Sequence, residues 1–399
     1  MGLMISLTEA RALIWERLSP LPPQMAMLAD VYGRVLREDV YAPEDIPAFD
    51  RSAMDGYALI AEDNSPRLRI TGEIQPGAAP VFKIERGECA RIFTGAPLPE
   101  GATQVLMQED ARVEDGFMTR LQASRIGHIR YRGEDARRGD LLLSSGTRLG
   151  QGELALLAGM GITKPTVSPP IRIVHFVTGN EIIEPSHTPL PGQIRDSNST
   201  LVAAFARRHQ GEIVHQERVS DDLDMLLTRV RAGLDDCDLL LISGGASVGD
   251  YDFGKKILIA LGFEVHFEKV NIRPGKPLIF ATRGQQAAFV LPGNPVSHFV
   301  TLQVEVRHAM ERFAGAEASW PEFKAKLTES FTRGVSTRET FWPARLSTEN
   351  GELVVRALRW KSSGDVTGMA GANALLHLTN ELEPPRTGDR VPTLLVDTL

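Results

Sequence analysis

The sequence has no run of about 18 uninterrupted apolar residues, the length that a membrane-spanning helix needs. An integral membrane protein is therefore not expected. The two cysteines, Cys89 and Cys237, are too few for a disulfide framework or a Cys-rich zinc site, which favours a reduced, cytoplasmic compartment. The N-terminal residues lack a basic segment and a small-residue cleavage site, and Ser6-x-x-Glu9 is a capping box that predicts an amphipathic helix there.

Several nucleotide- and metal-binding signatures are also missing. The chain contains no G-x-x-x-x-G-K-[ST], G-x-G-x-x-G, H-E-x-x-H or C-x-x-C, so P-loop ATP hydrolysis, dinucleotide redox chemistry and zinc proteolysis lose their main support. The 9 histidines show no ligand spacing. A net charge of −7 argues against binding of bulk nucleic acid, although an acidic protein can still carry a local basic cleft for small anions.

What the chain does contain is material for several cores. Its 399 residues, of which 42% are hydrophobic, favour about two to four domains and exclude wholesale disorder. Stretches that interrupt regular structure, two of them rich in proline, mark candidate boundaries at residues 42–49, 163–170 and 314–322. The regions 50–140 and 322–399 consist of short strand-like pieces between turns, which suggests a small β-rich unit and a β-barrel or sandwich.

The segment between residues 170 and 314 alternates strands and helices. Apolar strands are expected at residues 171–177, 212–219, 238–243, 264–270, 278–281 and 287–291, and helices at about 199–208, 223–232, 253–261 and 296–313. Asn198 or Ser199 is expected to cap the first of these helices. Strands that are apolar on both faces and alternate with helices predict a parallel sheet covered by helices on both sides.

Four loops that follow these strands have unusual compositions. They are residues 178–181 (TGNE), 243–249 (SGGASVG), 271–277 (NIRPGKP) and 291–295 (LPGNP). Ligands of open α/β sheets bind outside the carboxyl ends of the strands, and glycine-rich loops let backbone N–H groups approach an anion. Arg273 and Lys276 add positive charge. Each loop alone could be an ordinary tight turn, but the four together favour a phosphate-bearing ligand.

Three acidic residues fall at strand-to-helix junctions of the same region: Glu181, Asp221 and Asp252. Carboxylates beside bound phosphates are the usual arrangement for Mg²⁺, which prefers oxygen ligands. The alternative is that Asp221 and Asp252 are helix N-caps.

Gly245-Ala-Ser247-Val-Gly249 also matches the nucleophile-elbow pattern of serine hydrolases, with Asp252 and His266 following in a permitted order. An elbow needs a helix to start at once, whereas residues 250–253 (DYDF) indicate more loop first. The hydrolase hypothesis is therefore the weaker one, and labelling of Ser247 by a serine-reactive probe would test it.

Taken together, the motifs resemble one family, the MoeA/gephyrin-E type molybdopterin molybdenumtransferases of molybdenum cofactor synthesis. The matching stretches are FDRSAMDGYA (49–58), RIFTGAPLPEGA (91–102), RGEDARRGD (132–140), TGNE (178–181), SGGASVGDYDF (243–253), RPGKP (273–277) and LPGNPVS (291–297). They run in the family's order over nearly the whole chain.

The resemblance implies an α/β multidomain fold. Residues 1–46 and 140–169 would form an elongated, discontinuous N-terminal domain, residues 47–139 an inserted β-rich domain, and residues 319–399 a C-terminal β-barrel. Residues 170–318 would form the three-layer, MogA-like molybdopterin-binding domain with a central parallel sheet.

The resemblance also implies an activity: insertion of molybdenum from molybdate into adenylylated molybdopterin, with release of AMP, in an Mg²⁺-dependent step. Family members are homodimers whose active cleft lies between the molybdopterin-binding domain of one subunit and the first two domains of the other. A MogA-like adenylyltransferase would act upstream, and molybdoenzymes or their chaperones downstream, with no nucleic acid or membrane partner.

Carried over by motif, the resemblance assigns functional positions to Asp55, Thr94, Asp135, Glu181, Asp221 and Asp252, with the last three as candidate metal ligands. Ligand-binding positions would be Gly244, Gly245, Ser247, Gly249, Arg273, Lys276, Pro292, Gly293, Asn294 and Pro295. Two residues depart from the family's pattern. Asn180 stands where Asp is common, which removes a charge beside Glu181, and Arg273 replaces a frequent Lys. A binding or scaffold protein that keeps the fold but not the catalysis is therefore a second hypothesis.

Overall fold

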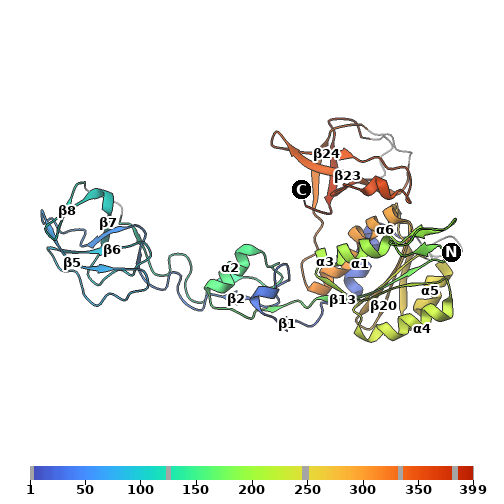
Figure 1. The fold of residues 1–399 in the computed structure, drawn as a ribbon, viewed down its shortest axis with the longest axis horizontal. Coiled ribbons are helices and arrows are strands. Elements are labelled where there is room, and N and C mark those ends of the chain that lie inside the picture. Colours follow the sequence, from blue (N-terminus) through green and yellow to red (C-terminus); the bar gives the residue numbers. More distant parts are fainter. Residues whose placement is uncertain (1–3, 123–126, 245–250, 331–335, 380–384, 399) are drawn as a thin grey trace. The chain divides into compact units, whose positions relative to one another are not determined.

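The computed structural model describes residues 4–122, 127–244, 251–330, 336–379 and 385–398, with only the backbone described at residues 251 and 252. The chain divides into two compact units (Figure 1). The first comprises residues 1–37, 146–151 and 164–399, and the second comprises residues 38–145 and 152–163. The four-domain division expected from the sequence stays a prediction.

The centre of the first unit is a six-stranded sheet with the order β16-β13-β17-β21-β20-β18. Its strands are β13 (Ile171–Thr178), β16 (Gly211–Val219), β17 (Leu239–Ser243), β18 (Glu264–Lys269), β20 (Pro277–Arg283) and β21 (Gln286–Leu291). The expectation of a purely parallel sheet is wrong at one strand, since β20 is antiparallel to both of its neighbours. The reason is the link of residues 284–285 between β20 and β21, because two residues can join only antiparallel strands.

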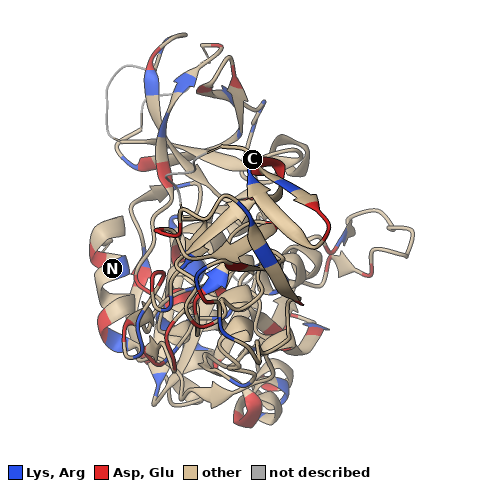
Figure 2. Ribbon diagram, turned by 90° about the vertical axis from the view of Figure 1, so that its left-hand side faces the viewer, with Lys and Arg blue, Asp and Glu red and all other residues tan. Residues whose placement is uncertain are grey.

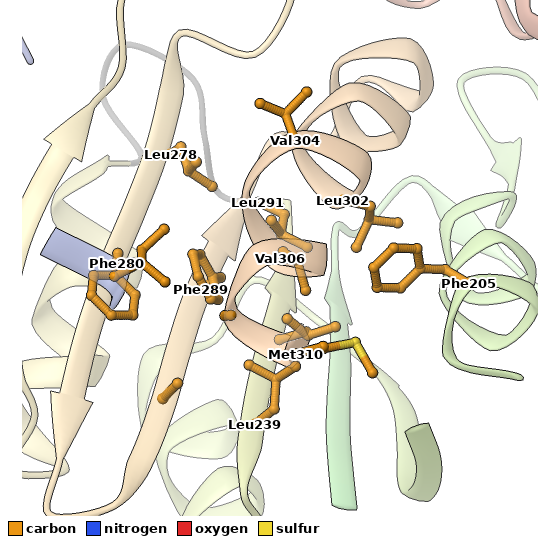
Figure 3. Packing of buried hydrophobic residues seen from close by; sticks show 14 of the residues in the cluster. Phe205, Leu239, Leu278, Phe280, Phe289, Leu291, Leu302, Val304, Val306 and Met310 are labelled. Carbon is orange, nitrogen blue, oxygen red and sulfur yellow. The ribbon is translucent and has the colours of Figure 1, made fainter. Parts of the chain in front are cut away.

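Helices cover both faces of this sheet and give it three layers. They are α1 (Leu7–Arg17), α3 (Asn198–Arg208), α4 (Leu223–Gly233), the short η3 (Leu234–Asp236), α5 (Tyr251–Ala260), α6 (Pro295–Thr301) and α7 (Arg307–Ala314). Successive strand residues point to opposite faces, so Leu239 and Leu241 pack with α1, α3 and α7, while Leu240 and Ile242 pack with α4 and α5. Figure 3 shows the first of these layers, with Phe205 of α3 and Met310 of α7 over the sheet.

The helix expected over residues 296–313 is continuous but contains a π-helical turn, η4 (Leu302–Val306), between α6 and α7. At the other end of the chain, the predicted capping box of α1 is confirmed. The Ser6 side chain accepts from the Glu9 backbone N–H, and the Glu9 side chain accepts from the Ser6 N–H. The cap of α3 differs from expectation, because the N-cap residue is Ser197 and Asn198 is the first helical residue.

The C-terminal residues of this unit form a closed five-stranded barrel of β22 (Glu322–Leu327), β23 (Glu339–Glu349), β24 (Glu352–Ala357), β25 (Ala374–Leu378) and β26 (Arg390–Leu395). β23 pairs with both β24 and β25, which closes the barrel around Trp342, Leu346 and Leu376. The short η5 (Val366–Met369) precedes β25. β19 (Ile272–Arg273) pairs in parallel with β23, so a segment of the α/β domain extends the barrel sheet.

The second unit is β-rich. Its six-stranded sheet has the order β7-β4-β6-β5-β9-β8 and contains β4 (Gly56–Leu59), β5 (Leu68–Ile74), β6 (Glu88–Ile92), β7 (Gln104–Met107), β8 (Ala111–Glu114) and β9 (Phe117–Arg120). The pairs β3–β10 (Arg51–Ser52 with Ile129–Arg130) and β2–β11 (Val40–Tyr41 with Leu141–Leu143) flank it in sequence. The short η2 (Gln108–Asp110) links β7 to β8, and α2 (Gln151–Gly159) follows β11.

Small elements complete the first unit: η1 (Leu28–Asp30), β1 (Gln24–Met25) paired with β12 (Thr166–Val167), and β14 (Ile182–Ile183) paired with β15 (Ile194–Arg195). No helix in the described part of the chain has the length and apolar character needed to cross a membrane. Segments that carry Lys or Arg are interspersed with segments that carry Asp or Glu (Figure 2), so a cluster of one sign is a local feature.

Candidate active site

The carboxyl ends of five strands meet at one edge of the central sheet. β13, β16, β17 and β21 are parallel, and β18 runs in the same direction because β20, antiparallel to both β18 and β21, lies between them. The loops after β13, β17, β18 and β21 are the four that the sequence singled out. They therefore begin at the edge where ligands of open α/β sheets bind.

A cavity of about 660 Å³ lies at this edge, and we call it the glycine-loop cavity. Residues from all but one of the four loops line it, with contributions from the start of α3 and from the barrel: Val177, Thr178, Gly179, Glu181, Ile182, Ile194, Arg195, Asp196, Ser197, Asn198, Asp221, Ser243, Gly244, Phe253, Gly293, Asn294, Pro295, Gly364 and Val366.

Only glycine fits at position 244 without strain. Its φ is +102°, and a Cβ atom there would lie 2.4 Å from the carbonyl oxygen of Thr178. A side chain at Gly293 would in turn come within 3.5 Å of the Gly244 Cα. Glycine at position 244 therefore lets the loop after β17 approach the end of β13 closely, whereas a side chain at position 293 would make an ordinary contact.

Two of the three predicted acidic ligands line this cavity: Glu181 and Asp221. Asp221 is not the helix cap, since Asp222 caps α4 by accepting from the Met225 N–H. Asn180 joins the two loops, because its Oδ1 accepts a hydrogen bond from the Asp221 N–H at 3.2 Å. The backbone of Asp252 lies in the first turn of α5, and its side chain is outside the described part of the structure.

These residues fit a magnesium ion as far as they are described. Mg²⁺ usually takes one or two protein carboxylates and completes its six oxygen ligands with water and substrate phosphates. Glu181 and Asp221 supply two carboxylates in one cavity beside glycine loops. Among the described residues, no group of three His, Cys, Asp or Glu side chains is close enough to hold a metal by itself, so such an ion would depend on the ligand's own oxygens.

A second, smaller cavity of about 350 Å³ is lined by four cations, and we call it the cationic pocket. The cations are Arg273, Lys276, Arg338 and Lys361, and the described lining includes no acidic residue. Burial and the nearby Arg273 both lower the pKa of Arg338. Positive groups that repel one another and lack a carboxylate partner in the lining favour a small, doubly charged anion in this pocket.

The pairing of β19 with β23 builds the cationic pocket. It brings Arg273 of the α/β domain opposite Thr340, two residues after Arg338. Trp360 of the barrel lies beside the Arg273 guanidinium, with 6.0 Å between the guanidinium carbon and the ring centroid. Sequence reasoning found Arg273 and Lys276 but missed Arg338 and Lys361, because they come from the barrel and no motif marks them.

The two cavities share one wall, formed by Gly293 and Asn294. The Asn198 side-chain N–H₂ donates to the Gly293 carbonyl at 2.9 Å, and the Asn294 side-chain N–H₂ donates to Ser363 Oγ at 3.0 Å. The Val296 N–H also donates to the Ser363 carbonyl. Pro292 lines the cationic pocket and Pro295 the glycine-loop cavity, so the predicted proline loop separates the two sites.

A chain of polar side chains, exposed at Gln216 and buried at His175, supports Ser243 in the lining of the glycine-loop cavity. The Gln216 Nε2 donates to His175 Nδ1 at 2.8 Å and to the Ser199 carbonyl, and His175 Nε2 lies 2.7 Å from Ser243 Oγ. Burial lowers the pKa of His175 to about 3, so the ring is neutral and carries its proton on Nε2. Ser243 therefore accepts from His175. Nothing in the sequence indicated this chain.

The remaining predicted positions lie in the second unit. Asp55 Oδ1 accepts from both the N–H and the hydroxyl of Thr94, each at 2.8 Å, and these hydrogen bonds lower the pKa of Asp55. Asp135 pairs with Arg130 at 2.6 Å. Asp55 and Thr94 thus form one cluster, and Asp135 belongs to a separate ion pair.

Comparison with known proteins decides the family. A family model described as "MoeA N-terminal region (domain I and II)" matches residues 5–161, "Probable molybdopterin binding domain" matches residues 175–312, and "MoeA C-terminal region (domain IV)" matches residues 324–396. A Bacillus subtilis protein named molybdopterin molybdenumtransferase is 34% identical over 92% of this chain and 89% of its own length. A Staphylococcus epidermidis protein of the same name is 30% identical over 93% and 90%.

The chain belongs to the MoeA family. A solved structure of a molybdopterin biosynthesis MoeA protein from Pyrococcus horikoshii OT3 agrees, with a TM-score of 0.84, 28% identity, and coverage of 98% of this chain and 100% of that one. The fold predicted from the resemblance is thereby confirmed, with β20 as the exception noted above.

The structure shows the contacts of Asn180 and Arg273, the two residues that depart from the pattern of the MoeA family. Asn180 uses its amide oxygen to hold the Asp221 backbone, a contact that an Asp oxygen could make as well. Arg273 lies near Trp360 and adds to the charge of the cationic pocket, so its substitution for Lys preserves the sign of the pocket.

Some predicted residues lie outside the described part of the chain. Gly245, Ser247 and Gly249 belong to this group, so the phosphate-binding and hydrolase interpretations of the loop remain untested there. His266, the third member of the hydrolase pattern, lies 2.7 Å from Thr282 Oγ1 through its Nε2, within the β18–β20 pair.

Proposed function

We propose that this chain is a molybdopterin molybdenumtransferase, which inserts molybdenum from molybdate into adenylylated molybdopterin and releases AMP. The observation that carries the proposal is the single peptide wall, Gly293–Asn294, between a large cavity suited to a nucleotide-bearing ligand and a small pocket of four cations. A reaction between an organic ligand and an oxyanion needs two such sites side by side.

Charge assigns the two substrates to the two cavities. Molybdate is a small tetrahedral dianion, which suits the cationic pocket with Arg273, Lys276, Arg338 and Lys361. Adenylylated molybdopterin is far larger and carries phosphates, which suits the larger glycine-loop cavity with the exposed Gly293 in its lining. Pro292 and Pro295 would then hold the loop that separates the substrates.

We propose Glu181 and Asp221, together with Asp252, as the residues that hold Mg²⁺ in the glycine-loop cavity. The ion would neutralise phosphate charge and so make AMP a better leaving group. The chain's own contribution is to place two carboxylates on loops that Asn180 ties together. No side-chain nucleophile is required, because the catalysis is electrostatic.

Asp55, Thr94 and Asp135 are proposed as further functional residues on the strength of their motif positions. Asp55 is ionised and held by Thr94, so it would act as a fixed negative charge rather than as a proton donor. The four-domain division, the homodimer, the cytoplasmic location, the upstream MogA-like adenylyltransferase and the downstream molybdoenzymes or their chaperones are likewise proposals that follow from the family.

The test is release of AMP by the purified protein from adenylylated molybdopterin, with and without molybdate and Mg²⁺. We expect release that depends on both, and its loss in Glu181→Gln with the fold intact by circular dichroism. Asp222→Asn is the matched control. Asp222 neighbours Asp221 but caps α4, and the Asn amide oxygen keeps that cap, so this change should leave both the stability and the requirement for metal nearly unaltered.

Two other outcomes would contradict the proposal and indicate a different function. Tight binding of the pterin without AMP release would indicate a scaffold protein, with Asn180→Asp as the next variant because Asn180 lies between the two carboxylate loops. Clean labelling of Ser247 by a serine-reactive probe, without affinity for the pterin, would indicate a hydrolase.

A further inference from the structure

Two buried oxygen atoms of the glycine-loop cavity have no hydrogen-bond partner among the described residues: Thr178 Oγ1 and Asn198 Oδ1. Thr178 is 4% exposed and Asn198 is 5% exposed. Buried polar atoms are nearly always paired, and an unpaired one is costly. Two such atoms in the lining of one cavity point to hydrogen bonds that a ligand completes.

The orientation of Asn198 defines the chemistry of this site. Its side-chain N–H₂ is already used, since it donates to the Gly293 carbonyl at 2.9 Å. The free atom is therefore the amide oxygen, which can only accept a hydrogen bond. An ionised phosphate or molybdate oxygen is also only an acceptor, so neither anion can satisfy it.

Thr178 lies where β13 ends, directly against the glycine loop. The Thr178 carbonyl and hydroxyl are the atoms that a side chain at Gly244 would contact first, at 2.4 and 2.8 Å. Glycine at position 244 therefore leaves the space beside the Thr178 hydroxyl free of a side chain. The loop geometry and the unpaired hydroxyl agree that a ligand group belongs at this point.

We propose that Thr178 and Asn198 form a subsite for uncharged N–H or O–H groups of the bound ligand, with the Asn198 amide oxygen as acceptor and the Thr178 hydroxyl as acceptor or donor. The inference rests on the proposed function, because adenylylated molybdopterin carries such donors in two places. One is the amino and ring N–H groups of the pterin, and the other is the ribose hydroxyls and adenine amino group. The subsite thus recognises the organic part of adenylylated molybdopterin, whereas the glycine loops bind its phosphates and the cationic pocket binds molybdate.

Thr178→Val is the decisive variant, because it keeps the shape of the side chain and removes only the unpaired hydroxyl. We expect the protein without ligand to melt at the same or a higher temperature, since no protein hydrogen bond is lost. Binding should nevertheless weaken by about 3- to 10-fold, the value of one hydrogen bond. If Thr178 were only a structural residue, the variant would melt at a lower temperature and bind the ligand as tightly as the unaltered chain does.

Thr393→Val is the matched control. Thr393 is fully buried, and its hydroxyl donates to the Val391 carbonyl at 3.0 Å inside the barrel. This variant should melt at a lower temperature and bind ligands as the unaltered chain does. Asn198→Ala is the second test variant. It should weaken binding as well, with some loss of stability because the contact with Gly293 disappears.

The binding probes are AMP and unsubstituted pterin, each measured by calorimetry with the full chain. A weaker affinity of Thr178→Val and Asn198→Ala for AMP alone would assign the subsite to the nucleoside, and for pterin alone to the pterin ring. Unchanged affinity of both variants for both probes would overturn the subsite, and so would a lower melting temperature of Thr178→Val without ligand. If either of these results is found while the unaltered chain still releases AMP in response to molybdate, the subsite is wrong but the proposed function stands. If the unaltered chain releases no AMP and binds neither probe, the proposed function and the subsite fall together.

Discussion

Glu305 is a carboxyl group buried in the π-helical turn η4, and neither of its oxygens has a hydrogen-bond partner among the described residues. Burial raises its pKa from 4.5 to about 8, despite the opposing influence of Arg11. The side chain is therefore mainly protonated at neutral pH. Periodicity predicted that this helix would be buried, but an unpaired acid at its centre follows only from the three-dimensional packing.

The pKa shift of Glu305 predicts how stability depends on pH. Between about pH 4.5 and 8 the folded chain keeps a proton that the unfolded chain releases, so the free energy of unfolding falls as pH rises through this window. Glu305→Gln should abolish that fall, so the free energy of unfolding of the variant relative to the unaltered chain should be higher at pH 8 than at pH 5. Urea denaturation of both proteins at pH 5 and pH 8 measures this free energy of unfolding.

Glu311 provides the control for this prediction, because it is a buried acid of the same helix that has partners. It pairs with Arg307 at 3.1 Å and accepts from Ser319 at 2.6 Å. Glu311→Gln should therefore destabilise the protein. Equal pH dependence of Glu305→Gln and the unaltered chain would show that Glu305 does not hold its proton at neutral pH.

At the scale of elements, strong periodic signals predicted the helices and strands of the α/β domain well, whereas short contacts between elements escaped prediction. The two-residue strand β19 is the clearest example. Residues 272 and 273 carry no strand signal, yet their pairing with β23 places Arg273 beside the barrel. Asp221 and Asp222 form a second example, since adjacent acids have the same sequence signature but only the backbone geometry shows which one caps α4.

His377 joins three strands of the barrel and gives this element its own pH dependence. Its ring lies 2.6 Å from Glu322 of β22 and 3.0 Å from Glu339 of β23. Burial alone would lower the pKa of His377, but the hydrogen bonds to the two carboxylates outweigh it and raise the pKa above 6.5. The stabilisation is therefore complete below about pH 6.5 and disappears as pH rises through the folded-state pKa.

His377→Gln should accordingly destabilise the protein by about 1.5–3 kcal/mol at pH 6, the range for hydrogen bonds to charged groups, and by less at pH 9. Urea denaturation followed by tryptophan fluorescence suits this test, since the Trp320 and His377 rings meet edge to face with 5.9 Å between their centroids. An equal loss at both pH values would mean that the charge on His377 contributes nothing.

At the scale of the whole molecule, the motifs indicated the family and the acidic and glycine loops. Two of the four cations of the cationic pocket, however, come from the C-terminal barrel, where the sequence predicted the fold but no ligand-binding residue. Arg338 lies about 65 residues beyond Arg273 along the chain, and only the closure of the barrel against the α/β domain brings the two together. A site whose charges come from two domains binds its anion only when both domains are folded and docked. Stability and anion binding should therefore be coupled.

This coupling gives the last prediction, which concerns Arg338. Molybdate should raise the melting temperature of the unaltered chain, because an anion bound only to the folded state adds about 2.7 kcal/mol when its concentration is 100 times Kd. Arg338→Met removes one partly buried cation that Arg273 repels, so the affinity of the variant for molybdate should fall about tenfold. Arg345→Met is the control, since Arg345 is an exposed residue of β23 outside the lining of the cationic pocket.

Thermal melts in molybdate, tungstate and chloride at matched ionic strength separate binding in the pocket from general screening of charge. Equal stabilisation of Arg338→Met and Arg345→Met by molybdate would show that the anion binds elsewhere.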